Sequence, residues 1–391
     1  MLLRTALALS LVCVMQAAEP FLDKRDIFPP EHWHNHASSV VELPNGDLLA
    51  VWYNGSGERT ADDVKVEGAR LRKGHKDWDP RFTVDDTPGF PDCNPALFLD
   101  SKQRLWLFWT VIIANEWHTG LLRYRVSTDY KEPGTPKWRE NEALLAIPRD
   151  FAASVKRQAE ANFPDDPHVM GMIPKAADKY FARMGWMPRA RPTELPSGRL
   201  LVPLYSDGFD FSLVAITDDG GATWSTSEPI VGNGPVQPSI ARRRDGSLVA
   251  YFRDNGPAPK RIIRSESNDQ GITWSKPVDT ELYNPGAGIE VQVLRDGTWA
   301  LLYNDLEKER YSLALSLSDD EGKTWKWTRH IERDGQNKPA SSYHYPSMVQ
   351  GRDGTLHLTY SYFQNHIPAD GPRKTIRYAH LNVDWVKAPA Q

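Results

Sequence analysis

Three histidines alternate with other residues near the start of the chain, at His32, His34 and His36. On a β-strand, residues two apart point to the same face, so this spacing would place three imidazole rings side by side. Imidazole is a common metal ligand and is also suited to proton transfer near neutral pH. No carboxylate lies in register with the three rings, so we expect no metal and no other cofactor. We expect His36 to transfer protons or to contact a substrate.

A repeated turn indicates which elements position such residues. The pattern Ser/Thr-x-Asp-x-Gly-x-Thr-Trp occurs at 217–224, 267–274 and 318–325, with a period near fifty residues. In each copy the Asp carboxylate can accept hydrogen bonds from turn amides, and the Gly can adopt a positive φ without steric cost. The Trp can bury a large apolar face between neighbouring hairpins. Three copies at one period indicate a repeat architecture.

A β-hairpin with a two-residue polar turn, often Asn-Gly or Asp-Gly, recurs along the chain and is followed by a third strand. We therefore predict an all-β fold, a six-bladed β-propeller that spans residues 19–391. Such a ring must be closed, and the segment Phe21–Trp33 is expected to add the outer strand of the last blade. The predicted hairpins are 38–53, 96–110, 192–205, 239–253, 290–304 and 347–361.

One segment departs from the strand pattern. Residues 139–188 contain Ala- and Lys-rich stretches at Phe151–Glu160 and Ala176–Arg183, which predict two short helices, with three prolines between them. The segment is a helical insertion between the second and third blades. It would serve either as a lid over the loop-bearing face or as a packing elaboration.

The first 18 residues predict a secretory signal peptide, with Arg4, an apolar run from Ala6 to Met15 and small residues at Ala17 and Ala18. We expect a secreted or periplasmic protein, and no later stretch is apolar enough to span a membrane. Cleavage would leave one cysteine, so no internal disulfide is expected. The net charge of −4 and the lack of a basic run argue against a nucleic-acid partner.

The three repeated turns and the six hairpins resemble the sialidase (neuraminidase) superfamily, in which this turn is called the Asp box or BNR repeat. The resemblance covers the whole predicted mature chain and implies a divergent member. In that family the Asp boxes lie away from the active centre, so they indicate the fold and not the activity. The family uses a Tyr nucleophile activated by a Glu, an Asp as acid/base, and three Arg that hold the substrate carboxylate.

Several positions of this chain match that pattern. Tyr345 lies nine residues before the turn glycine Gly354, where the family has its nucleophile. Arg253 and Arg310 match the second and third Arg of the carboxylate clamp. Asp62 and Asp63 lie in the loop where the acid/base is expected, and Asp63 fits the count better.

Other positions depart from the family. The first Arg falls on His36, and the Glu that activates the Tyr falls on Gln237. Two further acidic positions fall on Tyr53 and Ser361. Because Gln cannot accept a proton, Tyr345 would lack its usual base, and Glu290 is the nearest substitute in register. Two Arg and one His favour an acidic sugar other than sialic acid as the ligand.

Further residues at the same rim are expected to line substrate subsites, namely Asn94, Arg189 and His118. Trp117 or Trp186 would stack on a sugar face, although core packing is the commoner role of Trp. The expected partner is a glycan or oligosaccharide with an acidic sugar.

Three functions fit the resemblance and the residues. The first is a secreted glycoside hydrolase of the exo-α-sialidase type that acts on terminal acidic sugars. The second is a different glycan-cleaving enzyme on the same scaffold, such as a uronate lyase, in which His36 or His118 shares proton transfer with Tyr345. The third is a non-catalytic carbohydrate-binding propeller, which would need the Arg clamp but no acid/base.

Overall fold

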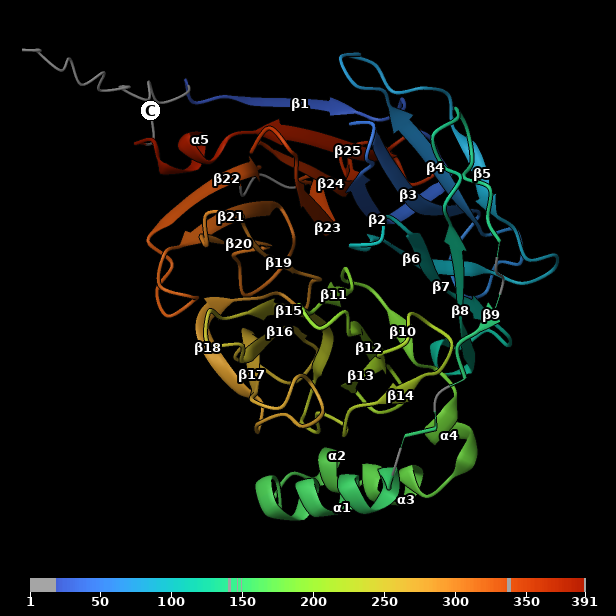
Figure 1. The fold of residues 1–391 in the computed structure, drawn as a ribbon, viewed down its shortest axis with the longest axis vertical. Helices are drawn as coiled ribbons and strands as arrows, with labels where there is room; N and C mark the ends of the chain where they lie inside the picture. The colour runs from blue at the N-terminus through green and yellow to red at the C-terminus, as the bar shows by residue number, and fades with distance from the viewer. Residues whose placement is uncertain (1–18, 140–141, 146, 149, 336–338, 390–391) are drawn as a thin grey trace, which may run out of the picture.

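The computed structural model describes residues 19–139, 142–145, 147–148, 150–335 and 339–389, and the predicted signal peptide at 1–18 lies outside this part of the chain. The described residues form six antiparallel sheets arranged around a common centre (Figure 1). This arrangement confirms the predicted six-bladed β-propeller. The first three blades comprise β2 (His34–Glu42), β3 (Leu48–Gly55), β4 (Lys65–Leu71) and β5 (Phe82–Asp85); β6 (Asp92–Leu99), β7 (Leu105–Ile112), β8 (Gly120–Ser127) and β9 (Glu142–Ala143); and β10 (Met187–Pro188), β11 (Thr193–Glu194), β12 (Leu200–Ser206), β13 (Phe211–Thr217) and β14 (Ser225–Thr226).

The remaining blades follow the same order of strands from the centre outward. They comprise β15 (Pro235–Arg242), β16 (Leu248–Asp254), β17 (Arg261–Ser267) and β18 (Val278–Tyr283); β19 (Glu290–Val293), β20 (Trp299–Tyr303), β21 (Ser312–Ser318) and β22 (Trp327–Arg333); and β23 (Ser342–Gln350), β24 (Leu356–Phe363) and β25 (Lys374–Leu381) with β1 (Leu22–Asp26). Their second strands, β16, β20 and β24, are largely buried, whereas the outer strands β18, β22 and β1 carry charged and exposed residues.

The ring is closed by β1, which comes from the opposite end of the chain to the other three strands of the sixth blade. It pairs with β25 from Leu22 opposite Leu381 to Asp26 opposite Arg377. Arg377 Nε donates to Asp26 at 2.7 Å across this pair. The expectation that the N-terminal segment adds the outer strand of the last blade is therefore met.

The core is a ring of apolar interfaces between neighbouring blades. Each pair of adjacent blades shares one cluster of buried residues, such as Trp109 against Val51 for the first two blades and Leu302 against Leu358 for the last two. The sixth and first blades pack in the same way through Tyr378 and Trp52. Because each interface buries apolar area on two sheets at once, the blades stabilise one another.

The three repeated turns have the hydrogen bonds that their sequence predicts. In the last copy, Asp320 accepts from the Thr324 amide at 2.8 Å and from the Thr324 and Ser318 hydroxyls at 2.6 and 2.8 Å. The Trp of the turn packs on the preceding blade, as Trp325 does against Tyr251. Each turn thus connects its own blade to the blade before it.

The helical insertion lies at the outer side of the third blade (Figure 1). Its helices are α1 (Phe151–Asn162), α2 (Pro167–Met170), α3 (Met172–Ala176) and α4 (Lys179–Arg183). Phe151, Val155 and Ala159 of α1 join the apolar cluster shared by the second and third blades. The second predicted helix, 176–183, is wrong in its bounds, because Asp178 caps α4 by accepting from the Tyr180 amide.

This packing favours the interpretation of the insertion as a packing elaboration.

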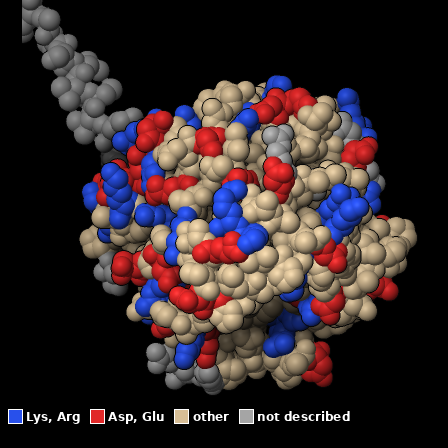
Figure 2. Space-filling model, turned by 90° about the horizontal axis from the view of Figure 1, so that it is seen from below, with Lys and Arg blue, Asp and Glu red and all other residues tan. Residues whose placement is uncertain are grey.

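Acidic and basic side chains are interspersed over the face seen from below (Figure 2). Within the described ranges, no helix is both long enough and apolar enough to cross a membrane. The C-terminal helix α5 (Val383–Lys387) packs beside the fifth and sixth blades.

The turn glycines provide a test of this packing. Gly322 and Gly354 both have positive φ, at 78° and 93°, but a Cβ on Gly322 would overlap the Tyr251 hydroxyl and approach Trp299, whereas a Cβ on Gly354 meets nothing within 4 Å. We expect Gly354→Ala to lower the free energy of unfolding by about 1 kcal/mol through backbone strain alone. Gly322→Ala should lower it by a further ~1–3 kcal/mol, because the interface must also open. Chemical denaturation of both variants measures the difference, and equal losses would contradict this account.

Candidate functional site

Four of the strands nearest the centre of the ring share one distortion. β2, β6, β15 and β23 each contain a β-bulge where the pairing register with the next strand shifts. At each bulge one residue other than glycine has a positive φ: Ala37 (55°), Asn94 (53°), Gln237 (54°) and Tyr345 (47°). Such conformations cost free energy and cluster at functional sites, where a bulge re-aims a side chain.

Three of these four residues line one cavity at the centre of the ring. The cavity has a volume of ≈ 160 Å³ and is lined by residues from five blades. The fifth blade approaches Tyr345 through Gly288, just before β19, where a Cβ would lie 2.6 Å from the Tyr345 ring. Side chains from distant parts of the chain thus converge on one small polar space. Its lining residues are Tyr53, Glu58, Asn94, Trp117, Tyr205, Asp207, Gln237, Arg253, Asn255 and Tyr345.

The hydroxyl of Tyr345 is held by two hydrogen-bond donors. Arg253 Nη1 donates to it at 3.0 Å, and Gln237 Nε2 donates at 3.4 Å. Burial opposes ionisation of the phenol, but the charges of Arg253 and Arg310 and the Gln237 hydrogen bond outweigh it. The pKa of Tyr345 therefore lies below its ordinary value. These contacts favour the phenolate form of Tyr345 without help from a neighbouring carboxylate base.

The groups around the Tyr345 ring divide into charged guanidinium groups and neutral imidazoles. Arg189 and Arg310 lie 4.8 and 5.9 Å from the ring centre, and the His36 ring lies 4.5 Å away. Burial, followed by nearby cations and neighbouring histidines, lowers the pKa of both His36 and His344 well below the ordinary value. Both are neutral at pH 7, so the positive charge around Tyr345 resides on Arg side chains.

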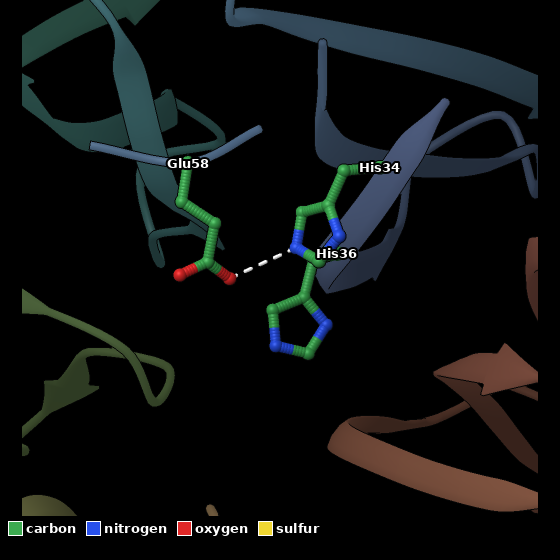
Figure 3. Close-up of side chains that lie close together, drawn as sticks. All are labelled: His34, His36 and Glu58. Atoms are coloured by element: carbon green, nitrogen blue, oxygen red, sulfur yellow. Dashed lines mark hydrogen bonds and ion pairs between the residues drawn. The ribbon is translucent and has the colours of Figure 1, made fainter. Parts of the chain in front are cut away.

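A carboxylate enters the cavity from the loop between β3 and β4. Glu58 Oε1 accepts a hydrogen bond from His34 Nε2 at 2.8 Å (Figure 3). It also accepts one from the Tyr53 hydroxyl at 2.8 Å. Burial would raise the pKa of Glu58, but the His34 and Tyr53 hydrogen bonds and nearby positive charge outweigh it and lower the pKa. Glu58 is therefore ionised at neutral pH, and it faces the same space as Tyr345 and Arg253.

The two histidines and this carboxylate also have the spacing of a metal site. One ligand atom from each of His34, His36 and Glu58 lies within 4.8 Å of the others. However, Lys374 Nζ lies 3.2 Å from His34 Nδ1, and an ammonium can only donate. His34 Nδ1 must then accept, so Nε2 carries the hydrogen that bonds Glu58 and has no lone pair for a metal. The geometry is that of a hydrogen-bonded chain from Lys374 through His34 to Glu58.

A second carboxyl group, Asp207, follows β12 and lines the other side of the cavity. Its side chain is exposed to solvent. The protein around the carboxyl group still removes part of its hydration, and this loss, which nearby Arg253 only partly offsets, raises the pKa of Asp207 to about 6. The value suits a group that gives and takes a proton near neutral pH.

The structure brings together most of the sequence-predicted site residues. Asn94, Gln237, Arg253 and Tyr345 line the cavity, and Asn94 donates to the Tyr205 hydroxyl at 3.1 Å. His36, Arg189 and Arg310 surround Tyr345 as described above. Arg310 itself donates to the Gly286 carbonyl at 2.6 Å and is bonded to His344 at 2.8 Å.

The structure places Asp62 and Asp63 outside the cavity, contrary to the expectation of an acid/base there. Both are exposed, and the Asp63 carboxylate accepts from the Ser56 amide and hydroxyl at 2.9–3.2 Å. Asp63 therefore stabilises the loop that carries Glu58. The carboxylate that this loop contributes to the cavity is Glu58.

Glu290 and His118 also lie apart from the Tyr345 hydroxyl. Glu290 is buried beside Arg189 and Arg191, and its carboxylate accepts from the Met348 amide at 3.2 Å. It balances buried positive charge and does not bond Tyr345 in place of a base. His118 packs against Phe181 of the insertion with ring centres 5.6 Å apart, and its neighbour Trp117 lines the cavity.

The sequence analysis missed four residues that line the cavity, namely Tyr205, Asn255 and the two carboxyl groups Glu58 and Asp207. Tyr205 lies seven residues after the turn glycine Gly198, and Arg253 lies seven residues after Gly246. The two positions therefore correspond in the third and fourth blades, and Asp207 lies two residues beyond Tyr205. A search for polar residues just beyond the second strand of each blade would have found both Asp207 and Glu58.

Comparisons with known proteins agree with this architecture. The chain matches the BNR repeat-like domain over residues 46–182 and 181–358. It is 23% identical over 246 residues to the anhydrosialidase of Macrobdella decora, a match that covers 58% of this chain and 31% of that protein. The chain thus spans about a third of the length of this curated relative.

Two solved structures show the same fold. The intramolecular trans-sialidase of Ruminococcus gnavus superposes with a TM-score of 0.67 and 15% identity, covering 91% of this chain and 96% of that one. The NanB sialidase of Streptococcus pneumoniae superposes with a TM-score of 0.69 and 12% identity, covering 93% and 71%.

The state of Tyr345 can be tested by spectrophotometric titration. Because Arg253 and Arg310 favour the phenolate, we expect one tyrosinate to form below the ordinary tyrosine pKa of about 10. This step should be absent in Tyr345→Phe and present in Tyr283→Phe, which removes an exposed tyrosine instead. An early step that survives in Tyr345→Phe would contradict the assignment.

Proposed function

The chain belongs to the BNR repeat-like domain family, and we propose that it is a sialidase-type glycoside hydrolase that removes a terminal acidic sugar from a glycan. The observation that carries this proposal is the Tyr345 hydroxyl held between Arg253 and Gln237, with two carboxyl groups lining the same cavity. A purely sugar-binding propeller would not need a phenol with a lowered pKa beside a carboxyl group whose pKa is about 6.

In the proposed reaction, the Tyr345 oxygen attacks the anomeric carbon of the sugar. The bond from that carbon to the glycosidic oxygen breaks, and Asp207 gives its proton to the departing oxygen. Water then attacks the anomeric carbon, the Asp207 carboxylate takes a proton from that water, and the Tyr345 phenolate is released. The covalent intermediate divides one difficult step into two easier ones.

The other residues of the cavity contribute charge and orientation. Arg253 and Arg310 place two guanidinium groups beside Tyr345, and a planar guanidinium pairs well with a carboxylate. We therefore propose an acidic sugar as the substrate. The ionised Glu58 faces the reacting centre and would stabilise positive charge that develops on the sugar ring.

We also propose that the protein is exported, on the basis of the signal-peptide pattern of residues 1–18. An extracellular or periplasmic enzyme would meet glycans outside the cytoplasm. Export and the Arg side chains around Tyr345 are both compatible with an acidic glycan as the substrate.

A uronate lyase is the second candidate, and one observation favours it. The neutral His36 ring lies 4.5 Å from the Tyr345 ring, so two groups that transfer protons are adjacent. In a lyase, one of them would remove the carbon-bound proton next to the uronate carboxylate, and a double bond would form as the glycosidic oxygen leaves with a proton. The ultraviolet-absorbing unsaturated product distinguishes this reaction from hydrolysis.

The nucleophile can be tested with a panel of fluorogenic sialosides and uronides. We expect the wild-type protein to release the free acidic sugar and Tyr345→Phe to lose kcat/KM by about a thousandfold or more, because the attacking oxygen is gone. Tyr343→Phe is the matched control, since Tyr343 lies two residues away on β23 and packs in the apolar interface. Equal activity of the two variants would exclude Tyr345 as the nucleophile, and an unsaturated product would select the lyase.

The role of Asp207 predicts a pH dependence. A general acid must carry its proton, and the pKa of Asp207 is about 6, so kcat/KM should fall as the pH rises through about 6. Asp207→Asn should remove this limb and lower kcat/KM about a hundredfold or more on natural glycans, with a smaller loss on substrates whose leaving group needs no proton. Asp210→Asn removes a nearby negative charge and should shift the limb to lower pH. A limb that is unchanged in Asp207→Asn would assign the acid to another group.

A further inference from the structure

A second cavity lies at the opposite end of the strands from Tyr345, between the first and sixth blades. β2 runs from His36 near the central cavity to Glu42, which lines this second one. The cavity has a volume of ≈ 400 Å³ and lies beside the hairpin turns of both blades. Its volume is within the range of about 300–1,000 Å³ that small-molecule sites occupy.

The charged side chains that line this second cavity are mostly cationic. They are the four cations Arg25, Arg72, Lys73 and Arg352 and the two carboxylates Glu42 and Asp353. The chain as a whole has a net charge of −4, so this excess of positive charge is local. A concave surface with one predominant sign of charge attracts ligands of the opposite sign.

Two of the cations have no carboxylate partner. Within the part of the chain that the structure describes, neither Lys73 nor Arg352 forms an ion pair. Arg352 is nonetheless held in place, because its guanidinium donates to the Pro44 carbonyl. The stem of Lys73 lies against Gly46, where a Cβ would come within 2.8 Å of Lys73 Cδ. Both side chains are therefore positioned at the cavity, and among the described residues neither is bound to a carboxylate.

The other charged groups offset part of this positive charge. Arg25 and Arg72 pair with Asp23 and Asp79, neither of which lines the cavity. The two lining carboxylates keep their negative charge, but each is held by a backbone amide. Glu42 accepts from the Arg352 amide at 2.9 Å, and Asp353 accepts from the Thr355 amide at 2.9 Å.

The wall of the cavity is polar and partly aromatic. His357 and His380 stack with ring centres 4.5 Å apart, and His357 Nδ1 is bonded to the Tyr378 hydroxyl at 2.7 Å. Burial lowers the pKa of His357 to about 4 and lowers that of His380 as well. Both rings are neutral at pH 7. His357 is buried in the stack, whereas the half-buried His380 lies at the cavity, where an aromatic ring suits a sugar better than a bare ion.

We propose that this cavity is a second binding site, separate from the Tyr345 cavity, for an anionic saccharide that carries a sulfate ester or a carboxylate. Lys73 and Arg352 would contact the anion through charge-assisted hydrogen bonds, and the His380 side of the cavity would contact the sugar ring. The site is independent of the proposed hydrolase activity, because it needs only the charge and the shape of the cavity. On a polymeric glycan it would hold a part of the chain remote from the bond that is cleaved.

Isothermal titration calorimetry of the full chain tests this site. The probes are N-acetylglucosamine 6-sulfate and glucuronic acid, with neutral N-acetylglucosamine and inorganic sulfate as comparisons. We expect the two charged sugars to bind, the neutral sugar not to bind, and the double variant Lys73→Ala/Arg352→Ala to weaken binding at least about tenfold. The matched control Arg244→Ala/Lys323→Ala removes two exposed charges from turns at the same end of the ring and should bind as the wild type does.

A second variant separates this site from the central cavity. Arg253→Ala alters the Tyr345 cavity and should retain binding of the charged sugars at the second site. Loss in Arg253→Ala together with retention in Lys73→Ala/Arg352→Ala would place the ligand in the central cavity and overturn the proposal. Inorganic sulfate that binds as tightly as the sulfated sugar would reduce the site to one for a free anion. No binding by either charged sugar would also overturn it.

Discussion

The site depends on the closure of the ring between its first and last blades. His36 Nδ1 is bonded to Ser361 Oγ at 2.9 Å, and Lys374 contacts His34 at 3.2 Å, so residues more than three hundred positions apart meet across this seam. The pairing of β1 with β25 holds the two ends of the chain in this register. If the seam opened, Tyr345 on one side and Glu58 on the other would no longer face one cavity. The fold therefore builds one site from strands that lie far apart in the sequence.

Several Arg side chains of the site lie where little water reaches them, and their charge determines the electrostatics of the site. Buried positive charge is costly unless it is compensated. Glu290 provides part of that compensation beneath Arg189 and Arg191, and an ionised Tyr345 would provide more beside Arg253. Burial first, and nearby Arg310 in addition, lower the pKa of His36 and His344 and keep both rings neutral. Positive charge at this site thus lowers the pKa of the phenol and of both imidazoles, which favours an ionised Tyr345 and neutral histidines.

The bulges on the innermost strands explain how side chains reach the cavity at all. Regular strands in a propeller direct their side chains toward neighbouring blades, where they fill the apolar interfaces. A residue with positive φ breaks this alternation and turns its side chain toward the centre, at a conformational cost that the surrounding sheets sustain. Asn94, Gln237 and Tyr345 occupy this same place in three different blades. Part of the site is therefore a repeated backbone feature that carries a different side chain in each of these three blades.

The sequence alone determined the fold and much of the site, because both follow from spacing. The repeated Asp turns and hairpin glycines indicated six blades, and counting back from those glycines located Gln237 and Tyr345 at the cavity. Counting could not decide which acid of the loop between β3 and β4 faces the cavity. Asp63 matched by position but bonds Ser56, whereas Glu58 is drawn inward by His34 and Tyr53. Those partners are brought together by the pairing of β2 with β3 and by the path of the loop that follows β3. The direction of a loop side chain was therefore decided only by the tertiary structure.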